Sequence, residues 1–178
     1  TSRWALDSGN AMIHRIFSNL SSFKGLEFKP GLNVLIAQKE SGASDKQTRN
    51  RAGKTSLIEI IHFLTGSDAG RDSLFRAEAL ADNTFGIEFD LSGEKTVAER
   101  SGKEKSKIHV GGGRFLKGKT RISNSEWVEV LGEQMFGLHT LPEGAGRVPT
   151  FRSLFAYFVR RQLSGAFTTP EKQATMQQ

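Results

Sequence analysis

One nearly all-apolar run, Leu32–Ala37, constrains the fold of this chain more than any other feature. It is short for a helix, and its composition is typical of a strand that is buried on both faces in a parallel sheet. A polar and charged stretch follows over residues 38–52, and Gly53–Ser56 then opens a second apolar segment that ends at Leu64. The succession of strand, loop and helix predicts an α/β fold in which the helix packs against a sheet.

The tetrapeptide that opens the helix has the composition of a phosphate-binding loop. A helix N-terminus presents unpaired N–H groups and a partial positive charge, and both favour phosphate oxygens. Gly53 lets the backbone approach a ligand, Lys54 adds a charge near the β and γ phosphates, and the Thr55 hydroxyl suits Mg²⁺. Ser56 offers a further hydroxyl to phosphate. The alternative is an ordinary helix with a solvated lysine in its first turn, although that lysine opposes the helix dipole.

The loop before the helix departs from the standard spacing G-x-x-x-x-G-K-[ST]. Thr48 stands where that pattern has its first glycine, and the nearest earlier glycine is Gly42. The loop is therefore longer than usual by about six residues. The additional residues are charged at Asp45, Lys46, Arg49 and Arg51. Such an insertion can fold over a nucleotide, contact a partner or lie in solvent.

Residues 12–66 resemble the N-terminal opening of the ABC-type ATPase heads of SMC, RecF and RecN proteins. The matching positions are Asn19–Phe23, Pro30–Asn33, Asn50 and Gly53–Thr55. Thr48 and Arg51 replace two glycines of the family pattern. The long charged loop is similar to that of a bacterial branch of coiled-coil ATPases found near defence or mobile-element genes.

The resemblance implies a P-loop NTPase fold for residues 12–169, with a mixed sheet and an antiparallel β meander. It implies ATP and Mg²⁺ as cofactors, bound by Asn50, Gly53, Lys54, Thr55 and Ser56, with Thr55 on the metal. It also implies DNA and a C-terminal ATPase lobe or second head as partners, with a homodimer possible. The action on DNA would belong to repair, chromosome maintenance or defence.

The resemblance further implies a glutamine that contacts Mg²⁺ and the attacking water. Gln162 is the candidate for this catalytic and metal-binding role, because Phe155–Leu163 is similar to the strand that precedes this glutamine and its exit. The alternative is a surface glutamine after a basic pair.

Two motifs of the family are absent from the sequence: an LSGGQ-like signature and an apolar run that ends in Asp-Glu. In the family both lie in the C-terminal lobe, which is reached through a coiled coil. We therefore expect the chain to bind Mg-ATP but to hydrolyse it only when that lobe completes the site. Residues 1–11 are expected to be a tag or linker, and residues 170–178 a flexible tail or the start of the coiled coil.

Two other functions stay open. The glycines missing at Thr48 and Arg51 favour a non-catalytic DNA- or protein-binding module with a degraded phosphate loop, whereas the intact Gly53–Thr55 opposes it. A stand-alone P-loop kinase or GTPase would carry a base-specificity motif, and none is recognisable.

The charge of the chain favours an anionic partner, since 25 Lys and Arg stand against 19 Asp and Glu. One Gly-rich stretch is especially basic, at Lys103, Lys105, Lys107, Arg114, Lys117, Lys119 and Arg121. One interpretation is that this stretch contacts a DNA backbone. The other is that it forms the solvated edge of a hairpin, where lysines discourage strand pairing. We leave both interpretations open.

Other site classes are excluded by composition and spacing. Without cysteine there is no disulfide framework, thiolate zinc site or cysteine nucleophile. The histidines His14, His62, His109 and His139 lack metal-ligand spacing. Glu59 and His62 are expected to interrupt the apolar helix surface for packing or hydrogen bonding. No apolar run is long enough to span a membrane, so we expect a cytoplasmic protein.

Patterning predicts the remaining elements. Strands are expected at Met12–Phe17, Gly25–Phe28, Phe85–Leu91, Thr96–Arg100 and Lys107–Val110. Helices are expected from Gly53 or Lys54 to Leu64 with Gly66 as a left-handed cap, over Ser73–Ala81, and from a cap at Ser123 or Asn124 to Phe136. Phe151–Val159 is either a strand or a helix. Its aromatic residues, Phe151, Phe155, Tyr157 and Phe158, are expected in the core rather than in a base-stacking platform.

Overall fold

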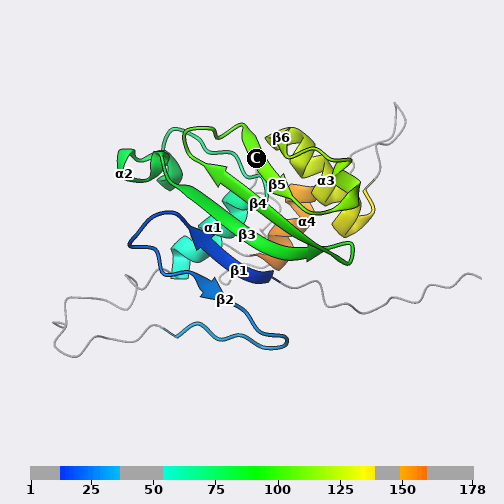
Figure 1. The fold of residues 1–178 in the computed structure, drawn as a ribbon, viewed down its shortest axis with the longest axis horizontal. Helices are drawn as coiled ribbons and strands as arrows, with labels where there is room; N and C mark the ends of the chain where they lie inside the picture. The colour runs from blue at the N-terminus through cyan, green and yellow to red at the C-terminus, as the bar shows by residue number, and fades with distance from the viewer. Residues whose placement is uncertain (1–12, 37–53, 139–148, 160–178) are drawn as a thin grey trace, which may run out of the picture.

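The computed structural model describes residues 13–36, 54–138 and 149–159 (Figure 1). The strands are β1 (Ile13–Ser18), β2 (Leu26–Glu27), β3 (Thr84–Leu91), β4 (Glu94–Ser101), β5 (Lys107–Gly111) and β6 (Arg121–Ser123). The α-helices are α1 (Lys54–Leu64), α2 (Glu78–Ala81), α3 (Asn124–Phe136) and α4 (Phe151–Phe158), and two 3₁₀ turns are η2 (Leu74–Arg76) and η3 (Arg114–Leu116). This is a mixed α/β architecture, as the sequence predicts.

The six strands form one sheet in the order β2-β1-β3-β4-β5-β6, and each neighbouring pair is antiparallel. The longest ladder joins β3 to β4, where Thr84 pairs with Ser101 and Leu91 with Glu94. The hairpin turn between them, Ser92-Gly93, has φ of 51° and 76°. Positive φ at both central residues is the geometry that suits the right-handed twist of a two-residue hairpin. The predicted meander is thus confirmed.

The predicted mixed sheet is not found, because the described strands contain no parallel pair. Leu32–Ile36, expected as a buried parallel strand, has no regular secondary structure, and Leu32 is 92% and Ile36 71% exposed. That prediction is wrong for residues 32–36, and Ala37 lies outside the described residues. The physical reason is that a strand apolar on both faces needs neighbours on both sides, and the described part of the chain supplies none.

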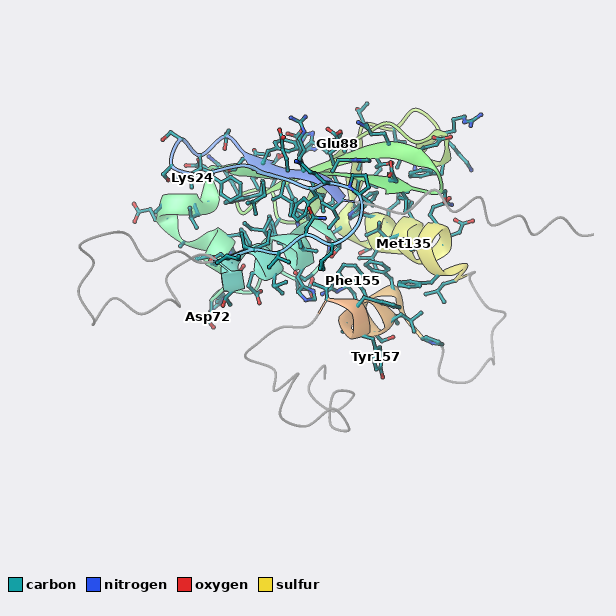
Figure 2. All side chains as sticks on the ribbon, turned by 90° about the horizontal axis from the view of Figure 1, so that it is seen from below. Lys24, Asp72, Glu88, Met135, Phe155 and Tyr157 are labelled. Atoms are coloured by element: carbon teal, nitrogen blue, oxygen red, sulfur yellow. The ribbon has the colours of Figure 1, made fainter. Side chains whose placement is uncertain are left out.

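The core lies between one face of the sheet and helices α1, α3 and α4 (Figure 2). Alternate residues of β3, β4 and β5 point into it, as the period of two in an extended chain requires. The strands contribute Ile16, Phe85, Ile87, Phe89, Leu91, Ala98, Ile108, Val110 and Ile122. The helices contribute Ile60, Ile61, Phe63, Leu64, Trp127, Leu131, Phe151 and Phe155. The expectation that α1 is buried against the sheet is confirmed.

The helix ends follow the capping signals of the sequence. The Ser123 hydroxyl accepts a hydrogen bond from the Glu126 N–H at the start of α3, and Gly137, with φ of 63°, ends that helix. Gly66, with φ of 92°, ends α1. The helix predicted over Ser73–Ala81 is divided into η2 and α2.

The undecided segment from Phe151 is a helix. Thr150 and Ser153 form a reciprocal capping box at its start, and Phe151 and Phe155, one helical turn apart, are buried. The strand that the family resemblance implied from Phe155 is therefore wrong for residues 155–158. The expected core position is confirmed for Phe151 and Phe155.

The core prediction is wrong for the other two aromatic residues of α4. Tyr157 is 54% and Phe158 74% exposed. Figure 2 shows the Tyr157 side chain on the side of α4 that faces away from the sheet. A helix buries only the face it turns to its neighbours, so the four aromatic side chains do not share one environment.

Candidate functional site

The start of α1 is the candidate site. The helix begins at Lys54, and its first turn carries no acidic residue. Thr55 and Ser56 are consecutive residues of this turn, both half-buried, and the second half of the helix is buried beneath the sheet. The N-terminus of this eleven-residue helix carries a partial positive charge, and no carboxylate of the first turn offsets it.

Only part of the predicted site belongs to the described structure. Asn50, Gly53 and Gln162 lie outside the described residues, as does the side chain of Lys54. Their roles therefore stay predictions. The two hydroxyls of Thr55 and Ser56 and the backbone of the first turn fit a phosphate with its Mg²⁺, since these are the donor groups that such a site uses.

The opposite end of α1 is fixed by a buried guanidinium from β4. Arg100 is only 2% exposed, and its Nη1 donates to the carbonyls of Phe63 at 2.6 Å and Ser67 at 2.8 Å. Its Nε donates to the Lys105 carbonyl at 2.9 Å, and its Nη2 binds the same oxygen. Burial lowers the pKa of Arg100 to about 10, so the group remains charged at neutral pH. A cation at a helix C-terminus is favoured by the helix dipole.

A second guanidinium ties α4 to the same end of α1. Arg152 donates from Nη2 to His62 Nδ1 at 2.9 Å and from Nη1 to the Thr65 hydroxyl at 3.3 Å. His62, which is buried, has its Nε2 3.0 Å from the Val159 carbonyl. The sequence-based expectation that His62 breaks the apolar helix surface for hydrogen bonding is confirmed.

Sequence reasoning did not single out Arg100 or Arg152. The register of β4 contains a signal for the first, because Thr96, Ala98 and Arg100 occupy alternate positions of one strand and all three are buried. An arginine in phase with core residues must be satisfied by buried acceptors. For Arg152 the sequence contains no comparable signal.

The basic stretch is largely neutralised. Four of its seven cations pair with carboxylates: Lys103 with Asp82, Arg114 with Glu94, Lys119 with Glu126, and Arg121 with Glu104. The described ranges together hold 16 Lys and Arg against 14 Asp and Glu. This surface therefore favours the solvated hairpin edge over a dedicated DNA contact.

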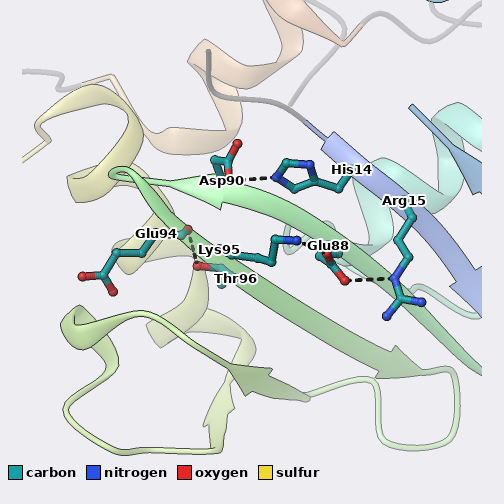
Figure 3. A network of polar contacts seen from close by, with 7 residues as sticks. All are labelled: His14, Arg15, Glu88, Asp90, Glu94, Lys95 and Thr96. Atoms are coloured by element: carbon teal, nitrogen blue, oxygen red, sulfur yellow. Dashed lines mark hydrogen bonds and ion pairs between the residues drawn. The ribbon is translucent and has the colours of Figure 1, made fainter. Parts of the chain in front are cut away.

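The open face of the sheet carries a second set of ion pairs (Figure 3). Glu88 accepts from Arg15 Nε at 2.9 Å and lies 2.9 Å from Lys95 Nζ. The hydrogen bond from Lys95, and next that from Arg15, lower the pKa of Glu88. His14 contacts Asp90 at 2.8 Å on the same face. Glu88 and Asp90 are thus paired with residues of neighbouring strands, and Glu94, also drawn, pairs with Arg114.

Two further features are absent from the described ranges. No group of three or more His, Cys, Asp or Glu residues is placed there to hold a metal ion. Nor does any helix in those ranges have the length and apolar character required to cross a bilayer.

Comparison of the chain with protein-family models, curated proteins and solved structures finds no match. The function must therefore be argued from the residues and their geometry.

Proposed function

We propose that residues 12–169 are the N-terminal lobe of an SMC/RecF-like ABC ATPase head and bind Mg-ATP at the start of α1. The observation that carries the proposal is the first turn of α1, where Lys54, Thr55 and Ser56 open a buried helix without an acidic neighbour in that turn. Asn50 and Gly53 shape the loop, Thr55 holds Mg²⁺, and Gln162 contacts the metal and the attacking water.

Under this proposal the lobe needs a C-terminal partner lobe before it can hydrolyse ATP. In Leu32–Ile36 four large aliphatic side chains are exposed, and within the described residues none of its backbone groups bonds to another backbone group. An extended apolar segment in this state resembles a strand that lacks its partner. The C-terminal lobe supplies the adjoining strand together with the missing carboxylate and signature motif, and hydrolysis depends on it. DNA is the molecule on which the completed ATPase acts.

Thermal unfolding of the chain with and without Mg-ATP tests nucleotide binding. A ligand present at roughly 100 times its Kd stabilises the folded state by about 2.7 kcal/mol, which raises the unfolding midpoint by about 5–10 °C in a chain of this size. We expect this rise for the native chain and its loss in Lys54→Ala.

Lys117→Ala is the matched control, because Lys117 is an exposed lysine in the turn after η3. It should keep the full rise. A rise of equal size in Lys54→Ala would show that ATP binds elsewhere and would contradict the proposed site.

The second candidate is a DNA- or protein-binding module without nucleotide chemistry, favoured by Thr48 and Arg51 in place of loop glycines. DNA affinity that persists without ATP and in Lys54→Ala would favour this module. The ion pairs of the basic stretch weigh against DNA binding through this stretch, because four of its seven cations are already paired with carboxylates.

A further inference from the structure

His62 lies between two helices that are far apart in the sequence. It belongs to α1, is 2% exposed, and contacts Arg152 through Nδ1 and the Val159 carbonyl through Nε2. The ring of Phe155 meets it edge-on, with centroids 5.8 Å apart. From this geometry we infer that His62 and Arg152 form a pH-sensitive latch that holds α4 on α1. The inference does not depend on nucleotide binding.

The two contacts fix the tautomer of the imidazole. A guanidinium can only donate hydrogen bonds, so Nδ1 must accept from Arg152. In a neutral ring the proton is then on Nε2, which donates to the Val159 carbonyl. One neutral tautomer satisfies both partners, and the latch is closed in this state.

The charged groups around His62 come from every side of the α1 end. Arg152 contacts it from α4, and Arg100 binds the next carbonyl along, that of Phe63, from β4. Asp68, in the loop after α1, acts electrostatically on Arg100. Glu59 lies three residues before His62 on α1. Arg152 lies on the Nδ1 side of the ring at hydrogen-bond distance.

Protonation of His62 would place an N–H on Nδ1, directly against the N–H of Arg152. Two donors and two positive charges would then face each other, and the contact becomes repulsive. Protonation is therefore disfavoured while the contact is closed, and it occurs when α4 has moved away and the imidazole is in water, where an ordinary histidine gains its proton as the pH falls through about 6.5. The latch therefore opens in acid, and α4 loses its polar attachment to α1.

Hydrogen exchange of the whole chain, followed by mass spectrometry at pH 7.5 and pH 5.5 and corrected for intrinsic exchange, tests the latch. We expect the protection of amides in 151–158 to fall by up to about tenfold at pH 5.5, while 124–136 in α3 retains its protection. Equal protection of α4 at the two pH values would overturn the proposal, as would an equal loss in both helices.

Two variants identify the groups responsible. In Arg152→Gln an amide can still donate to Nδ1 but carries no charge, so we expect the pH-dependent loss in α4 to disappear. His62→Gln should remove it as well. His109→Gln, on the open face of the sheet, is the matched control and should retain it. Retention of the effect in Arg152→Gln would overturn the latch.

Discussion

At the scale of single residues, the polar organisation depends on charges that are buried to different degrees. Arg100 is buried and donates to three backbone carbonyls, so its role is to supply hydrogen bonds to carbonyl oxygens that water cannot reach. Glu88 lies on the open face of the sheet between two exposed cations, Arg15 and Lys95. The first kind of contact fixes the position of a helix, and the second gives modest stability that depends on pH.

Glu88→Gln should lower the free energy of unfolding by about 1 kcal/mol at pH 7. The folded-state pKa of Glu88 is lowered by its hydrogen bonds to Lys95 and Arg15, so its contribution is present above the ordinary glutamate value. That contribution is lost as the pH falls from about 5 through the lowered pKa. Urea unfolding at several pH values measures the difference, which should vanish in acid.

Glu129→Gln is the control for this experiment, since Glu129 is an exposed carboxylate on α3. It should leave the unfolding free energy unchanged at pH 7. A difference between native chain and Glu88→Gln that stays constant from pH 7 to pH 3 would contradict the assignment.

Residue roles were predictable only where the sequence pattern itself was unusual. His62 stands out because it interrupts an apolar helix face, and a hydrogen-bonding role could be expected from that alone. Its partner Arg152 is 90 residues away. Nothing local to Arg152 indicates that partner, since the contact exists only after α4 has packed on α1.

At the scale of elements, the strands and helices stabilised by local signals were predictable. The hairpin between β3 and β4 has its turn residues and its alternation within one short stretch, and α3 has both caps. Leu32–Ile36 was not predictable, because an apolar run specifies that burial is favourable but not which partner provides it. For α4 the aromatic composition suited either a strand or a helix, and the capping box decided between them.

Gly102 tests how the segment containing η2 is attached to the sheet. A Cβ at Gly102 would lie 1.6 Å from the Phe75 carbonyl oxygen. Phe75 cannot move away easily, because its ring stacks on Phe63 at 4.1 Å and meets Phe85 at 5.2 Å. Gly102→Ala should therefore reduce the free energy of unfolding by about 2–4 kcal/mol.

Gly70→Ala is the matched control, because a Cβ at Gly70 has nothing within 4 Å. Urea unfolding should show a change within about 0.5 kcal/mol for this variant. If both alanine variants were equally stable, the close approach of Phe75 to Gly102 would be wrong.

At the level of the whole molecule, the apolar segment Leu32–Ile36 is exposed, and none of its backbone groups bonds to another backbone group within the described residues. The helices cover one face of the sheet and ion pairs cover much of the other (Figures 2 and 3). The exposed aliphatic side chains of Leu32–Ile36 contribute little to this core. Under the proposed function, a C-terminal lobe would cover this segment and supply the catalytic motifs.

Val34→Asp should therefore leave the stability of the isolated chain within about 0.5 kcal/mol of the native value, because Val34 is exposed. Ile87→Asp, which places a carboxylate in the core, should prevent stable folding. Chemical unfolding measures the free energy of unfolding of the two variants. A large loss in Val34→Asp would show that the chain buries this segment by itself.

Calorimetric titration of Mg-ATP into the native chain and into Lys54→Ala tests the proposed phosphate site directly. We predict saturable binding of a single ATP per chain in the native protein and its loss in the variant. Absence of binding to the native chain at millimolar ATP, or equal binding to both proteins, would contradict a phosphate site at the start of α1.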